Sequence, residues 1–209
     1  MRLLLIFFIL TSSIFALSIN DSLLKIHATL LPKITLMDYE LKNKLINDSI
    51  TIAIVYNKKE YKSAVSLRNK IDTKYQNGIK NHSIKTKIVL YKSIKNTKAN
   101  IYYLFPSNKK NIKNVIDIAK ENQALTFSYL KDNLKSGVMI SINIGERVQP
   151  IINIDAIRTA HINLRPVLLS ISTIYKQDVV NLLINFKSTQ IKPIYLAGLD
   201  KIFINKIIN

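Results

Sequence analysis

"SITIAIVYN", residues 49–57, is the stretch of this 209-residue chain that most clearly specifies a secondary-structure element. It is rich in β-branched residues, its large apolar residues alternate with smaller or polar ones, and it ends at the polar Asn57. This pattern predicts a β-strand. Residues 59–72 follow with apolar side chains at helical spacing, so they predict a helix. A turn centred on Asn77-Gly78 comes next. Two further strands are predicted at 84–91 and 99–107.

The alternation of strands and helices continues towards the C-terminus. Residues 108–123 predict a helix with Ser107 as its N-cap, because their apolar residues share one helical face. Residues 124–129 predict a fourth strand, and 130–137 a short helix or loop ending at Gly137. The remaining elements are two strands forming a hairpin around Gly145 (138–154) and a helix at 166–176 with Pro166 in its first turn.

Upstream of the first strand, residues 21–31 place Leu23, Leu24, His27, Leu30 and Leu31 at helical spacing. Asp21 or Ser22 is the expected N-cap, and Pro32 is expected to interrupt or end the helix. The whole order predicts an α/β fold: three layers with a mostly parallel central sheet flanked by helices, plus a late β-hairpin.

The N-terminus has the composition of a secretory signal peptide. Arg2 precedes an apolar run over residues 3–10, followed by small polar residues and a cleavage position at Ala16. The run is short for a membrane span, so an uncleaved anchor is the less favoured alternative. We therefore expect export to the periplasm and three parts: a signal peptide (1–16), an α/β domain (17–176) and a C-terminal extension without assigned role (177–209).

Charge and cysteine content narrow the classes of function. The formal net charge is +18, carried mostly by lysines that are scattered along the chain rather than gathered in one motif. We interpret them as solvated surface, and nucleic acid is not an expected partner. The chain has no cysteine, which excludes disulfides and thiolate metal sites.

Motifs that carry chemistry are missing from the sequence. The four glycines form no phosphate-binding loop, and the three histidines (His27, His82 and His161) have no metal-ligand spacing. There is no GxSxG stretch for a nucleophilic serine. We therefore expect no catalytic residue, no metal and no cofactor, and hence a protein that is not an enzyme.

The segment 136–172, "SGVMISINIGERVQPIINIDAIRTAHINLRPVLLSIS", resembles the C-terminal signature of the YfiR family. The matching positions run without a gap: Gly137, Ile152, Asn153, Ile154, Asp155, Ala156, Ala160, Ile162, Leu168 and Leu169. The chain departs from the family at His161, where glycine is usual, and at Arg165-Pro166, which replaces Ser-Ser. The resemblance extends over roughly residues 20 to 175.

This resemblance implies a small periplasmic regulator. Its partner would be a membrane-bound signalling protein with a periplasmic sensing domain, a diguanylate cyclase or a sensor kinase, and its effect would fall on cyclic di-GMP signalling and biofilm formation. The resemblance leaves open whether the protein forms a homodimer. From the residues themselves, we expect the partner to bind near Glu146, Arg147, Arg158, His161 and Arg165, because arginine is common in interfaces.

Two other functions are compatible with the sequence. A periplasmic small-ligand-binding protein, feeding a sensor kinase or transporter, would have a deep pocket at the carboxyl ends of the strands around Asn57, Pro106 and Tyr129. An exported enzyme would need histidines and carboxylates that the fold brings together. Ordinary solvated charge is the alternative interpretation of the five proposed partner-binding residues.

Overall fold

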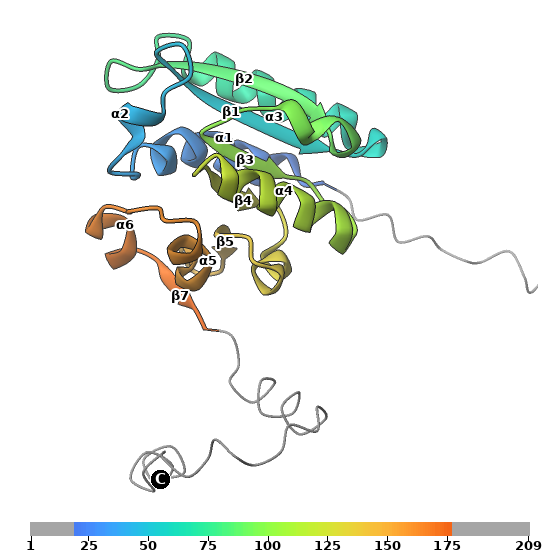
Figure 1. Cartoon of the computed structure of the whole chain (residues 1–209). Coiled ribbons are helices and arrows are strands. Elements are labelled where there is room, and N and C mark those ends of the chain that lie inside the picture. Colours follow the sequence, from blue (N-terminus) through green and yellow to red (C-terminus); the bar gives the residue numbers. More distant parts are fainter. Residues whose placement is uncertain (1–18, 177–209) are drawn as a thin grey trace, which may run out of the picture. The chain divides into compact units, whose positions relative to one another are not determined.

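Strand β1 (Ser49–Tyr56) is buried along its whole length, which is usual for a strand of a parallel sheet with helices on both faces. It belongs to a seven-stranded sheet in the order β2-β1-β3-β4-β5-β6-β7. The computed structural model describes residues 19–176 (Figure 1). The other strands are β2 (Ser83–Leu90), β3 (Ile101–Leu104), β4 (Leu125–Ser128), β5 (Ile140–Ile144), β6 (Val148–Asn153) and β7 (Thr173–Tyr175).

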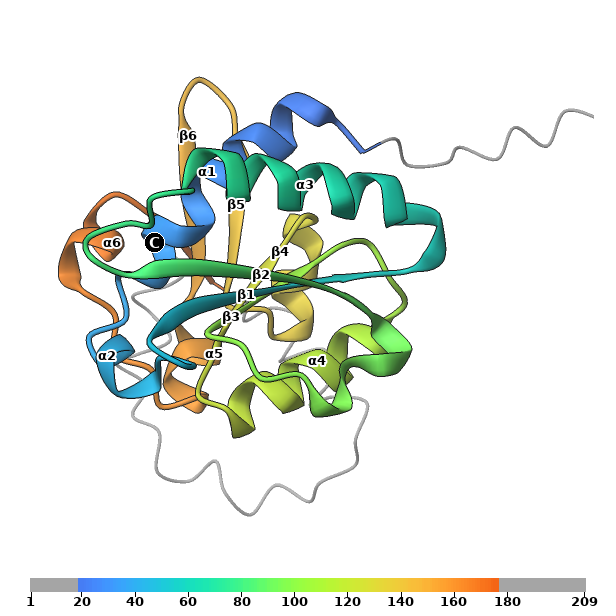
Figure 2. The same cartoon turned by 90° about the horizontal axis from the view of Figure 1, so that it is seen from above.

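All neighbouring strands are parallel except β5 and β6, which form an antiparallel hairpin. Figure 2 shows α1 and α3 on one side of the strands and α4 on the other. The predicted α/β fold, with a mostly parallel sheet between helices and a late hairpin, is therefore confirmed. The helices are α1 (Asp21–Thr35), α2 (Leu41–Lys44), α3 (Tyr61–Lys74), α4 (Lys109–Glu121), α5 (Ile154–Thr159) and α6 (Pro166–Ser170), with 3-10 turns η1 (Lys58–Glu60), η2 (Tyr91–Asn96) and η3 (Lys131–Ser136).

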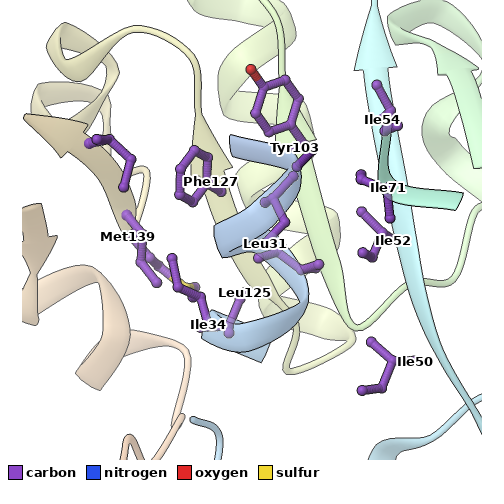
Figure 3. Packing of buried hydrophobic residues seen from close by; sticks show 14 of the residues in the cluster. Leu31, Ile34, Ile50, Ile52, Ile54, Ile71, Tyr103, Leu125, Phe127 and Met139 are labelled. Carbon is purple, nitrogen blue, oxygen red and sulfur yellow. The ribbon is translucent and has the colours of Figure 1, made fainter. Parts of the chain in front are cut away.

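Successive side chains of β1 point to opposite faces of the sheet and enter two different cores. Ile52 and Ile54 pack beneath α1 and α3, whereas Ala53 and Val55 face α4. Figure 3 shows the first of these cores, where Leu31 of α1 lies among side chains from several strands. Both sheet faces are thus covered, as a parallel sheet requires.

The structure corrects two predicted helix N-caps. Asn20, and neither Asp21 nor Ser22, caps α1, since its side chain accepts a hydrogen bond from the Leu23 backbone N–H. Asn108, one residue after Ser107, caps α4 in the same way. Each cap lies one residue from its predicted place, because several adjacent residues have side chains suited to the role.

Two larger differences concern Pro32 and the last element. The α1 helix continues through Pro32 to Thr35, and the proline is buried. Pro32 lies in the last turn, so it removes one backbone hydrogen bond without breaking the helix. The helix predicted for 166–176 ends at Ser170, and β7 follows beside β6. The apolar residues of that stretch therefore belong to two elements.

Candidate functional site

The loop after α1 and the loop between α5 and α6 are held together by backbone hydrogen bonds. The Tyr39 N–H donates to the Asn163 carbonyl at 2.9 Å, and the Arg165 N–H donates to the Met37 carbonyl at 2.8 Å. Between these bonds, Asp38 and Leu164 form an antiparallel bridge. We call these two paired loops, residues 36–40 and 162–165, the corner.

A buried carboxylate fixes the first loop of the corner. Asp38 is almost inaccessible to solvent, and its two oxygens have different donors. Oδ1 accepts the Glu40 backbone N–H at 2.9 Å, and Oδ2 lies 2.9 Å from Nζ of Lys44. Glu40 in turn accepts a hydrogen bond from the Asn163 side chain, which ties the two loops a second time. Hydrogen bonds and one buried ion pair therefore hold the two loops of the corner together.

A hollow of about 420 Å³ lies beside the corner. Its walls include Tyr39, Arg158 and Asn163, together with apolar residues of α5 and α6. Tyr39 is 55% exposed, and the guanidinium carbon of Arg165 lies 5.0 Å from the centre of its ring. This cation–π contact holds a flat aromatic face and a positive charge together at the rim of the hollow.

A second, larger groove of about 660 Å³ lies between α1, the start of β6 and α6. Met37 from the first corner loop contributes to its wall, as do Arg147 and Val148 of the hairpin, Val167 of α6 and the following residue Ile171. We call it the hairpin groove. Its lining is mostly apolar, and its charged residues are both basic.

The structure separates the five predicted partner-binding residues into two groups. Arg158, His161 and Arg165 are exposed around the hollow, whereas Glu146 and Arg147 are exposed at the tip of the β5–β6 hairpin. In Figure 2 the tip lies beside α1, and β6 leads from it towards α5. The length of β6 alone places about 17 Å between the groups. They do not form one cluster, although both border the surface that contains the corner.

His161 adopts a left-handed backbone conformation, with φ 53°. It follows Ala160, the C-cap residue of α5, and its own N–H and that of Ile162 donate to the carbonyls of Arg158 and Ile157, respectively. This pattern is a Schellman cap, which favours glycine at the His161 position. A non-glycine residue at this position is strained, so His161 holds the end of α5 in a conformation that glycine would adopt more easily.

The carboxyl ends of the strands, where a small-ligand pocket is the alternative prediction, are largely filled. The Asn57 side chain donates to the Pro106 carbonyl at 2.8 Å. Tyr129 lies against His27 and Phe105 beneath α1. The hollow that includes Asn57 measures about 150 Å³, below the usual range of ligand pockets.

The histidines do not come together. His27 is buried among aromatic rings, with Nδ1 2.8 Å from Oη of Tyr103, and burial lowers its pKa to about 4. His82 lies at the start of β2 and His161 after α5. Over residues 19–176, no three histidines or carboxylates lie close enough to hold a metal ion. No helix in that same range is long and apolar enough to cross a membrane.

Sequence reasoning missed the contribution of the α1 side to this surface. Tyr39, Lys33 and Met37 belong to the corner or the hairpin groove, yet they lie far in sequence from the signature segment. For the α6 side of the groove, one available signal was the four-residue spacing of the apolar residues Val167 and Ile171 within the helix predicted at 166–176.

Comparison with known proteins identifies the family of this chain and solved structures with a similar fold. The sequence model of the family described as YfiR/HmsC-like matches residues 44–173. A search of curated proteins finds no match.

Among solved structures, a conserved domain protein from Vibrio cholerae O1 biovar El Tor strain N16961 is similar, with a TM-score of 0.52 and 15% identity over 73% of this chain. The ABC domain in complex with L-Trp from Streptococcus pneumoniae has a TM-score of 0.45 and 13% identity over 68% of this chain. The match spans 60% of the length of each of these structures. At 15% identity the first likeness shows the α/β fold alone.

Proposed function

The chain belongs to the YfiR/HmsC-like family, and from this premise we propose that it is a periplasmic, non-enzymatic regulator. Its partner is the periplasmic sensing domain of a membrane-bound signalling enzyme, a diguanylate cyclase. By favouring one state of that domain, it controls the production of cyclic di-GMP in the cytoplasm and thereby biofilm formation. Such control requires only that it binds the two states of the partner with different affinity.

The corner is the observation that supports this proposal most directly. Paired backbone segments and a buried Asp38 hold an exposed tyrosine, with a stacked arginine, in fixed positions. Tyrosine and arginine are the residue types that most often dominate protein–protein binding energy. Because they are already ordered, their side chains lose little conformational entropy when a partner binds.

The proposal places Arg158 and Arg165 in contact with the partner, with His161 between them in sequence. The hairpin residues Glu146 and Arg147 form a second contact region. Regulation of this kind needs no bound cofactor or metal, since the difference in affinity for the two states of the partner shifts the equilibrium between them.

The test is recovery of the partner from membranes. The full-length protein, tagged at its C-terminus, is expressed in its own cells and purified from detergent-solubilised membranes. We expect a membrane protein with a diguanylate cyclase domain to be recovered, and cyclic di-GMP to change when the gene is deleted. Paired Arg158→Glu and Arg165→Glu substitutions should reduce recovery about tenfold or more, as loss of interface arginines does.

A matched variant controls for the change in charge. Lys109→Glu with Lys113→Glu alters the same number of charges on α4, whose buried face packs on the opposite side of the sheet. Recovery with this variant should stay within about twofold of the wild type. If the exported, folded wild-type protein brings down no membrane signalling enzyme, the proposed function is wrong.

A further inference from the structure

The hairpin groove has the properties of a docking site. We propose that it binds an acidic amphipathic helix of the partner, with the apolar face of that helix lying in the groove. This inference deepens the proposed function and rests on it, because the helix is assigned to the same membrane-bound enzyme. It adds a ligand chemistry and a surface that adjoins the corner at Met37 but lies mainly on α1, the hairpin and α6.

Exposed apolar side chains gather at this groove. Val148 is 45% exposed, and Val167 and Ile171 are each 56% exposed, and all three line it. Ile144, 52% exposed, pairs across the hairpin with Val148. Among the described residues, seven large hydrophobic side chains are highly exposed; three of them line the groove, and Ile144 lies next to it on the hairpin. Exposed apolar patches of this kind mark interaction surfaces.

The origin of the patch lies in the hairpin. On the face that meets α1, the pair Ile142 and Pro150 is buried. The next pair towards the tip, Ile144 and Val148, continues the same face beyond the edge of the core. The hairpin therefore extends an apolar strip beyond the part that other residues of 19–176 cover.

The charge of the groove selects an acidic occupant. Lys33, in the last turn of α1, and Arg147 both line it, and no acidic residue does. Neither cation forms an ion pair with another described residue. An apolar ligand flanked by carboxylates would bury the exposed side chains and pair with both cations, which gives orientation as well as affinity.

The backbone of β6 favours a helix over an added strand. Pro150 lies in β6 and has no N–H, so an extended ligand could not form a complete ladder there. Side-chain contacts must supply the binding energy instead. Val167 of α6 and Ile171, the C-cap residue that follows it, lie four residues apart, and their exposed apolar side chains can pack against the apolar face of a helix.

The experiment is site-specific photo-crosslinking with the full-length protein in its own cells. A photo-crosslinking residue replaces Val148 or Val167 in the groove, Arg158 at the hollow, or Lys113 on α4. Cross-linked peptides are identified by mass spectrometry. We expect Val148 and Val167 to cross-link to one helix of the membrane enzyme, with aspartate or glutamate beside apolar residues, and Lys113 to give no such product.

Charge reversal gives a second readout. Lys33→Glu with Arg147→Glu should lower the yield from Val167 about tenfold, whereas Lys109→Glu with Lys113→Glu should leave it within about twofold. Equal effects of the two pairs would overturn the assignment of an acidic ligand. A cross-linked segment that is basic or lacks apolar residues would overturn it as well.

The remaining outcomes separate the two proposals. Cross-linking of the enzyme from Arg158 but not from Val148 or Val167 would refute the groove inference and leave the proposed function standing. Cross-links from the groove to a second copy of this chain would show a self-association surface, which also refutes the inference. Absence of a membrane signalling enzyme at every position would refute both.

Discussion

At the scale of single residues, His27 shows how burial changes the chemistry of a side chain. It is 1% exposed and packs edge-on against the rings of Tyr103 and Phe127. Desolvation lowers its pKa to about 4, because the charged form loses its water. Its helical spacing already indicated a core position, but the aromatic neighbours come from strands about 75 to 100 residues away. His27 therefore acts as a structural, neutral residue.

This burial predicts an acid-sensitive stability. Between about pH 6.5 and pH 4 the unfolded chain binds a proton at His27 that the folded protein does not, so the free energy of unfolding falls as the pH falls. The contribution from His27 is about 2–3 kcal/mol between pH 7 and pH 4.5. In His27→Gln, which keeps a hydrogen-bonding group for Tyr103, this part of the pH dependence should disappear.

The measurement is urea unfolding of both proteins at the two pH values. His161→Gln is the control, since it changes an exposed histidine and should leave the wild-type pH dependence intact. An unchanged pH dependence in His27→Gln would show that His27 is not the group responsible.

At the scale of elements, the corner depends on a few polar contacts between loops. Asp38 accepts from the Glu40 backbone and lies against Lys44, so one buried carboxylate organises a whole turn. Local sequence predicts each helix and strand well because periodicity is a short-range property. It does not predict which loops pair, since that depends on how the finished elements pack.

Removal of this carboxylate should loosen the corner. We expect Asp38→Ala to destabilise the protein by about 2–4 kcal/mol, because the Glu40 N–H and the largely buried Lys44 ammonium lose their partner. Asp132→Ala, which removes an exposed ion pair with Lys135, should cost less than about 1 kcal/mol. Thermal and urea unfolding measure both. Similar losses in the two variants would contradict the structural role assigned to Asp38.

At the scale of the molecule, α1 covers part of one face of the sheet, although it precedes the segment that the family model matches. Its residues Leu24, Leu31 and Ile34 are buried against the sheet and α3. The α/β domain boundary at residue 17 and the extension at 177–209 remain predictions, and the extension lies outside the described residues. Because α1 packs on the sheet, the folded unit includes α1 and begins before residue 44, where the family match starts.

A truncation tests this argument. A chain that begins at residue 38 lacks α1, and the three buried side chains alone are worth about 5–9 kcal/mol, comparable with the whole stability of a domain. We expect it to lose near-ultraviolet circular dichroism and cooperative unfolding, whereas a chain that begins at residue 19 should keep both. Cooperative unfolding of the shorter chain would show that α1 is dispensable for the fold.

The sequence by itself determined the order of the main helices and strands up to β6, the α/β class and the family resemblance, because these follow from local periodicity and from one contiguous signature segment. It also placed the hairpin and the end of a short helical segment at Gly137, which the structure shows as the left-handed C-cap of η3. Only the tertiary structure decided which surface those elements form. The corner joins Glu40 to Asn163, 123 residues apart, and the hairpin groove combines α1, β6 and α6. Such contacts arise when separate elements bury their apolar faces together, and no local pattern encodes the resulting neighbours.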